Sequence, residues 1–253
     1  MEATQSLVTS VTTKHSRLIF PSQNLSSLTK MFEPAFQEAM LASRQGASEM
    51  ARGDYQKSIQ AFRRAIVSLK RTVDSDMPLP CLQSWRLTTM PIPNTQQLAE
   101  SDTNACAVFD RCFLLMPMPC HEKIPSNDKV ALVSAALLFN IALAYQLQAA
   151  RSSLTPLSSV HNGTAMRLYN RASQVLQGHL EGTSDGAALM LAVSNNMAAL
   201  ALEQLDLTAF ATHRTKMGKY LTVTSMTGTF HSNFFAGNFA ATDDVHKRPA
   251  PAA

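Results

Sequence analysis

The stretch SNDKVALVSAALLFNIALAYQLQAA, residues 126–150, decides the fold of this chain. It opens on Ser126-Asn127-Asp128, three residues that favour a helix start because their side chains can accept bonds from free backbone N–H groups. Apolar side chains then occur on nearly every side of the predicted helix. A helix of this kind must be buried from several directions. The stretch therefore predicts the central helix of an all-α protein.

The same stretch is the best candidate for a membrane span. From Val130 to Tyr145 it has sixteen residues, interrupted by Ser134 and Asn140. A span needs about 20 apolar residues. We therefore expect a buried core helix and no membrane span.

Helical signals continue on both sides of this stretch. Residues 30–73 predict two helices separated by Gly53-Asp54, and apolar residues recur at three- and four-residue steps in the second. A loop is expected at 151–163. Three more helices are then predicted, at Thr164 to Gln177, Thr183 to Gln204 and Leu207 to Leu221.

The region 74–127 differs from its surroundings, because it holds seven of the twelve prolines. Met-Pro-x-Pro recurs three times, beginning at Met77, Met90 and Met116. Alternating prolines cannot continue a helix and favour extended backbone. The runs Leu82 to Thr89 and Ala105 to Leu115 have strand character, so we expect a Pro-rich insert that forms a small hairpin or flap. A helix over Asn104 to Leu115 stays open as the alternative.

Three regions follow from these signals. A disordered N-terminal arm is expected at 1–28, a helical domain containing the insert at 29–221, and an irregular C-terminal tail at 222–253. The arm lacks the apolar core of a secretory signal. Because it is rich in Ser and Thr, a transit peptide is the alternative.

Composition and motifs argue against several function classes. The formal net charge is only +4, without the dense basic patch that nucleic-acid binding requires. No nucleotide-binding glycine motif and no metalloprotease or serine-hydrolase motif occurs. The four cysteines form no C-x-x-C pair, which favours free thiols in a reducing compartment. We expect a non-enzymatic, cytoplasmic protein with no metal or cofactor, and a nuclear or organellar location stays open.

Helix pairs with a small residue in the first helix and an aromatic in the second suggest tetratricopeptide-type units. The pattern occurs three times with decreasing fidelity. The first unit has Gly46 with Phe62, and the second has Ala142 with Tyr169 after an insertion between its helices. The third has Ala198 followed by Leu205-Asp206-Leu207. Phe139 and Tyr169 are expected in the core of the second unit.

A family resemblance rests on three motifs: LFNIALAY at 138–145, AMRLYNRA at 165–172 and SNNMA at 194–198. These motifs resemble a group of uncharacterised tetratricopeptide-like proteins of the type abundant in diatoms. The resemblance covers about residues 35–215 and implies a short array of antiparallel helix pairs with an interaction role. It implies no enzymatic activity.

Three residues at equivalent places in the units are candidate partner-binding residues. Asn140 and Asn196 each stand two residues before the small packing residue of their helix, and Arg44 holds the matching place in the first unit. Equivalent places on stacked repeats point the same way. A side-chain amide can both donate to and accept from an extended peptide backbone. The alternative is that Asn140 satisfies a neighbouring backbone group inside the array.

A second candidate surface is basic. Lys57, Arg64 and Arg71 recur every seven residues, opposite the apolar stripe of their predicted helix. They could dock an acidic partner, and the ordinary alternative is a solvated face. We expect a scaffold or adaptor that binds a protein or peptide in a concave groove. The alternative is a structural or regulatory subunit that buries apolar surface on an obligate partner.

Overall fold

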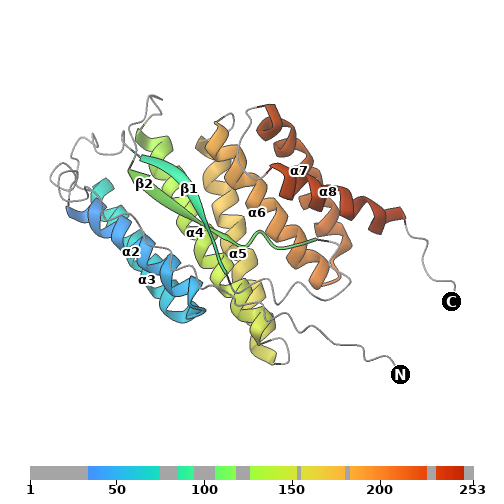
Figure 1. The fold of residues 1–253 in the computed structure, drawn as a ribbon, viewed down its shortest axis with the longest axis horizontal. Coiled ribbons are helices and arrows are strands. Elements are labelled where there is room, and N and C mark those ends of the chain that lie inside the picture. The colour runs from blue at the N-terminus through green and yellow to red at the C-terminus, as the bar shows by residue number, and fades with distance from the viewer. Residues whose placement is uncertain are drawn as a thin grey trace, which may run out of the picture. The chain divides into compact units, whose positions relative to one another are not determined.

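The computed structural model describes residues 34–74, 85–93, 106–117, 126–152, 155–179, 183–226 and 232–247. These residues contain seven helices and one antiparallel pair of strands (Figure 1). The elements are α2 (Pro34–Ala51), α3 (Tyr55–Asp74), β1 (Trp85–Pro91), β2 (Arg111–Pro117), α4 (Ser126–Arg151), α5 (Pro156–His179), α6 (Ser184–Glu203), α7 (Leu207–Met226) and α8 (Ser232–Lys247). The predicted N-terminal arm at 1–28 lies outside the described residues.

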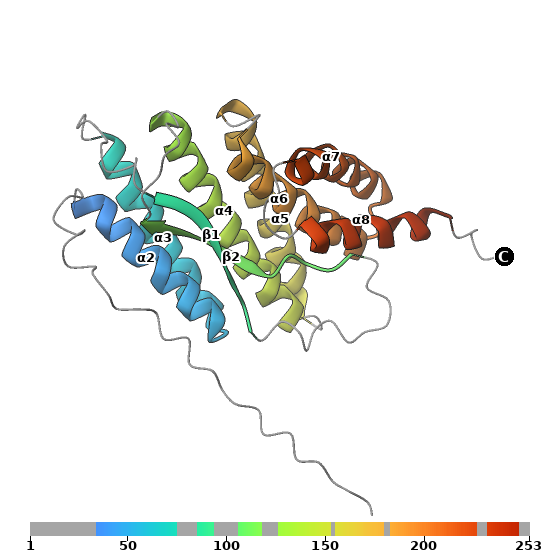
Figure 2. The same cartoon turned by 45° about the horizontal axis from the view of Figure 1, so that its top comes forward.

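The helices pack as antiparallel pairs, which confirms the all-α class. α2 packs on α3, α4 on α5 and α6 on α7, while α3 against α4 and α5 against α6 join one pair to the next. Figure 2 shows β1 and β2 lying across the side of the pairs formed by α2, α4 and α6. We call this side the inner face.

Small residues allow close packing between the two helices of the first pair. Gly46 of α2 faces the ring of Phe62 on α3, and a Cβ added at Gly46 would lie 2.8 Å from that ring. Phe62 is fully buried. In the second pair Phe139 and Tyr169 are also fully buried, with ring centroids 5.4 Å apart. Their predicted place in the core is confirmed.

The turns after α2 and α6 have the same hydrogen-bond pattern. Gly53 N–H donates to the carbonyl of Met50, and Asp54 N–H to that of Glu49, both at 2.9 Å. After α6, Leu205 and Asp206 make the corresponding two bonds, to Leu202 and Ala201. This is the Schellman arrangement that ends a helix on a residue with positive φ. Gly53 and Leu205 have φ of 78° and 58°.

The insert forms a hairpin in the described residues. β1 and β2 pair antiparallel over seven residues, from Trp85 opposite Pro117 to Pro91 opposite Arg111. A proline therefore stands at each end of the ladder, where the missing N–H costs least. The alternative of a helix over Asn104 to Leu115 is wrong, because 106–110 is extended or irregular and β2 follows directly.

The start of α5 differs from the sequence prediction. Residues 156–163 were expected in a loop but form the first turns of α5, which begins at Pro156. Proline suits the first position of a helix because its N–H would be unpaired there in any case. A Cβ added at Gly163 would meet no atom within 4 Å, so this glycine is tolerated within the helix and does not mark a turn.

The C-terminal tail was predicted to be irregular over 222–253, and this is wrong for most of it. α7 continues to Met226, and α8 occupies Ser232–Lys247. The hydroxyls of Thr222 and Thr224 donate to the carbonyls of Gly218 and Tyr220 one turn back, which satisfies these polar side chains within the helix. α8 is held by Phe235, which is 1% exposed.

Among the described residues, two helices are long and apolar enough to cross a membrane by length and composition, Asp128–Arg151 and Ser184–Glu203. In the fold, 78% and 83% of their most apolar windows are buried inside the protein. Core helices of this kind pass the same test, so the two segments are weak evidence for a membrane span.

Candidate functional site

The inner face binds the backbone of an extended segment of the insert, residues 106–113, which we call the segment. Asn140, on α4, is the clearest case. Its Oδ1 accepts a hydrogen bond from the N–H of Phe113 at 2.9 Å, and its Nδ2 donates to the carbonyl of the same residue at 2.7 Å. One amide side chain thus satisfies both backbone groups of one strand residue, as a neighbouring strand would.

Asn196, on α6, holds the segment four residues earlier in the same way. Its Oδ1 accepts from the N–H of Phe109 at 2.7 Å, and its Nδ2 donates to the Phe109 carbonyl at 3.2 Å. The Nδ2 also donates to the hydroxyl of Tyr169 at 3.0 Å. That hydroxyl donates in turn to Oε1 of Gln146, 2.8 Å away. Burial raises the pKa of Tyr169, so the hydroxyl keeps its proton and can make this bond.

Two further amides hold the start of the segment. Nδ2 of Asn195 donates to the carbonyl of Ala107 at 3.0 Å, and Nδ2 of Asn238 on α8 donates to the same oxygen at 2.6 Å. Asn238 also donates to Oδ1 of Asn195 at 2.8 Å. Ala107, Phe109 and Phe113 are an even number of residues apart, so in extended backbone their peptide groups face one edge. The four asparagines together line that edge.

The segment crosses the inner helices at the spacing expected of an extended chain. It meets α6 at Phe109 and α4 at Phe113, and β2 then continues to α2 near Met116, whose Sδ lies 4.0 Å from Nη2 of Arg44. A strand advances about 3.3 Å per residue, so contacts three or four residues apart are about 10–13 Å apart along the chain. That spacing lets each contact of the extended chain fall on a different helix.

Asn140 and Asn196 consequently point at one extended segment, at Phe113 and Phe109, and Arg44 lies near Met116 of β2. Asn140 and Asn196 are fully buried, and their bonds go to the chain's own insert. The alternative stated for Asn140, that it satisfies a neighbouring backbone group, describes its contact in this structure. Burial also lowers the pKa of Arg44.

The side chains of the segment fill an aromatic cluster. The Phe109 ring lies 4.9 Å from that of Phe235 and 5.6 Å from that of Phe234, both on α8. Phe113 meets the edge of Phe139 with ring centroids 5.1 Å apart. Edge-to-face pairs of this kind add stability beyond the area they bury. Amide side chains thus bind the backbone of the segment, and the rings of Phe109 and Phe113 determine which of its residues lie against the helices.

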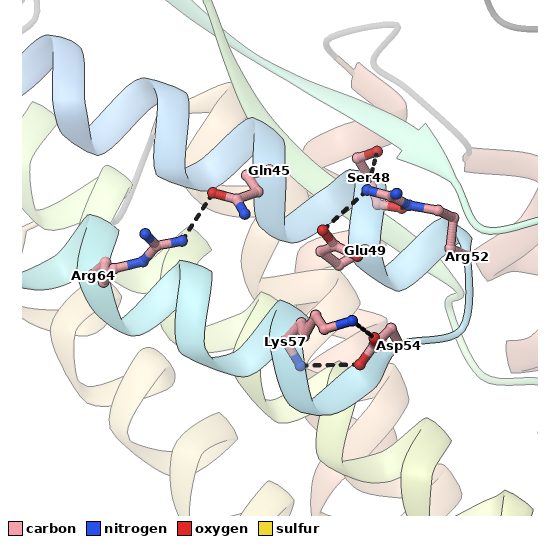
Figure 3. Close-up of polar contacts among 7 residues, drawn as sticks. All are labelled: Gln45, Ser48, Glu49, Arg52, Asp54, Lys57 and Arg64. Carbon is pink, nitrogen blue, oxygen red and sulfur yellow. Dashed lines mark hydrogen bonds and ion pairs between the residues drawn. The ribbon is translucent and has the colours of Figure 1, made fainter.

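The basic residues of α3 lie on a different surface. Lys57, Arg64 and Arg71 are all exposed, as the heptad spacing predicts. Each has an intramolecular contact: Lys57 with Asp54 at 2.7 Å, Arg64 with Gln45 at 2.8 Å and Arg71 with Glu38 at 3.6 Å. Figure 3 shows the first two. The hydrogen bond to Lys57 lowers the pKa of Asp54 and raises that of Lys57.

The described cysteines are buried and free. Burial raises the pKa of Cys106 to about 12 and raises that of Cys112 as well. A thiol with a raised pKa is a poor nucleophile, because the thiolate is the reactive form. Within the described part of the chain, no group of three or more His, Cys, Asp or Glu residues could hold a metal ion. Cys81 and Cys120 lie outside the described residues.

The comparisons with known proteins give no relative. No family model, no curated protein and no solved structure matches this chain.

Asn195, Asn238 and the phenylalanines of the segment were not among the predicted site residues. Asn195 adjoins Asn196, and the doublet at 195–196 was a usable signal. Asn238 lies in the tail that was predicted to be irregular, so no local sequence pattern indicated its contact with the inner face.

Proposed function

We propose that this protein is a non-catalytic helical-repeat module that binds an extended segment of a protein partner on its inner face, formed by α2, α4 and α6. The observation that carries the proposal is the paired hydrogen bonding of Asn140 and Asn196 to Phe113 and Phe109. An amide that bonds both the N–H and the C=O of one residue recognises backbone, and any extended peptide has that backbone.

The repeat pattern supports the same proposal. Arg44, Asn140 and Asn196 occupy equivalent places on three helices, and all three meet the continuous stretch from Phe109 to Met116. The turns at Gly53 and Leu205 have the same bonds. Arrays of stacked helix pairs leave one face of successive inner helices for a ligand. The buried free thiols fit a reducing compartment, and we propose a cytoplasmic location.

A peptide-display selection against the full chain tests the proposal. We expect enriched peptides to bind in extended conformation and to shift the amide signals of Asn140 and Asn196 in nuclear magnetic resonance spectra. The matched control is the triple variant Lys57→Ser, Arg64→Ser, Arg71→Ser, which changes only the basic face of α3. This variant should keep the affinity of the selected peptides.

Two results would contradict the proposal. Loss of binding in the triple variant, with unchanged Asn140 and Asn196 signals, would move the site to the basic face. A selection that enriches no peptide above background, against either the full chain or its Phe109→Ala variant, would remove the peptide-binding function.

A second candidate function has a specific observation in its favour. Leu157, Val160, Leu205 and Leu207 are large apolar residues that are 57–82% exposed. Asn162 on α5 bonds Glu203 at the end of α6 at 3.0 Å, so these residues lie at the same end of the helix pairs. Exposed apolar residues that gather in this way mark interaction surfaces. This favours a structural or regulatory subunit, whose Leu157→Ser, Leu205→Ser variant should fail to co-purify with its partner.

A further inference from the structure

The segment Cys106–Phe113 occupies the inner face as a bound peptide would. α4 makes few direct contacts with α2 or α6, and the space between these helices at the inner face is filled by β2 and the residues before it. The helix pairs themselves are joined on the other side, through α3 against α4 and α5 against α6. Removal of the segment would therefore leave an apolar trough with unpaired asparagines, which another extended chain could fill.

The segment also shows what that chain must look like. Its backbone bonds go to side-chain amides at Phe109 and Phe113, which constrain conformation and leave sequence free. Its rings enter the cluster of Phe139, Phe234 and Phe235. Aromatic rings four residues apart are hence the feature that a competing ligand has to reproduce.

We propose that Cys106–Phe113 is an internal ligand that closes the inner face, and that the partner is an extended peptide with the pattern Phe-x-x-x-Phe that replaces it. This inference rests on the proposed function. It adds the ligand class and a form of autoinhibition, because the tethered segment competes at the high effective concentration of an intramolecular ligand, about millimolar. A partner peptide must reach the groove against that competition.

Peptide binding in trans tests the proposal on the full chain. The probe is a fluorescent peptide with the sequence of residues 104–117, kept under reducing conditions and carrying a lysine tail for solubility. The chain variant is Phe109→Ala, which weakens the hold of the internal segment and substitutes no residue of a helix. We expect the probe to bind this variant at least tenfold more tightly than it binds the wild-type chain. The control probe, with Ala at both phenylalanine positions, should bind neither.

A second measurement decides the matter if Phe109→Ala folds poorly. The melting temperature of Phe109→Ala is measured with the probe and with the control probe. Under the proposal the probe raises it toward the wild-type value, because the peptide refills the trough, and the control probe does not. A melting temperature that stays low with both would show the segment to be an irreplaceable part of the core, and would overturn the proposal.

The two proposals fail differently. Display-selected peptides that bind the inner face without competing with the 104–117 probe would leave the proposed function standing and remove the internal ligand. Probe binding to Phe109→Ala that is abolished by adding Asn140→Ala would support both. Absence of any peptide binding to either chain would remove both.

Discussion

Leu205 adopts a backbone conformation that costs free energy for any residue with a Cβ. Its φ is 58°, and its side chain is 82% exposed, so no packing offsets the cost. The left-handed conformation costs about 1–2 kcal/mol for a non-glycine residue. Gly53 stands at the equivalent place after α2. The exposed Leu205 is thus a residue that folding alone does not explain, in keeping with its place among the exposed apolar residues Leu157, Val160 and Leu207.

Replacing Leu205 with Gly should stabilise the protein. The greater freedom of glycine in the unfolded chain offsets part of the gain, at about 0.5–1 kcal/mol. We expect the free energy of unfolding to rise by about 0.5–1 kcal/mol, measured by urea denaturation. Leu207→Gly is the control, because Leu207 begins α7 and glycine there should destabilise. A lower stability for Leu205→Gly would contradict the strain argument.

His213 predicts a pH dependence of stability. Burial lowers its pKa, with Lys216 acting in the same direction and Asp206 opposing, and its Nδ1 is buried without a partner. In the unfolded chain the imidazole titrates near 6.5. As the pH falls below about 6.5, the unfolded state binds the proton first, so the stability of the fold decreases. The melting temperature should fall over this range, and it should fall less in His213→Gln. Equal slopes in the two proteins would show that other groups cause the effect.

At the scale of the elements, α8 contributes to the site through one face. Phe235 and Asn238 point to the segment, whereas Asn233 is exposed. Phe235→Ala should cost about 3 kcal/mol, because it leaves a cavity beside Phe109. Asn233→Ala should cost almost nothing. Chemical denaturation measures both, and equal stabilities would mean that α8 does not hold the segment.

The helices and the site were predictable to different extents. α4 and α6 follow from their helix-start residues and dense apolar sequence. Thr183, where the sequence predicts a helix to begin, is the N-cap of α6, and its hydroxyl accepts a bond from the N–H of Gly186. The hairpin follows from its flanking prolines. α8 was missed because its anchoring residues, Phe235 and Asn238, are defined by contacts with a segment more than a hundred residues earlier. Local pattern carries no information on such contacts.

At the scale of the whole molecule, the inserted segment links helices that make few direct contacts with one another. It bonds α4 through Asn140, α6 through Asn195 and Asn196, and α8 through Asn238. Helix arrays without such a link unfold by local steps, because each unit contacts only the next. A strand that crosses several helices couples them, so the helices and the hairpin should unfold together.

Asn140→Ala tests this coupling. The change removes both partners of the Phe113 backbone groups, and each buried group left unpaired costs about 1–3 kcal/mol. Backbone amide signals of β1 and β2 report on the hairpin by nuclear magnetic resonance, while far-ultraviolet circular dichroism reports on the helices. In the wild-type chain we expect the two thermal transitions to coincide. In Asn140→Ala the hairpin transition should come first, because the hairpin loses its bonds at the centre of the inner face while the helix pairs keep their direct contacts. The control is Asn170→Ala, on the exposed side of α5, where the transitions should still coincide. If they coincide in Asn140→Ala as well, the paired bond to Phe113 does not couple the hairpin to the helices.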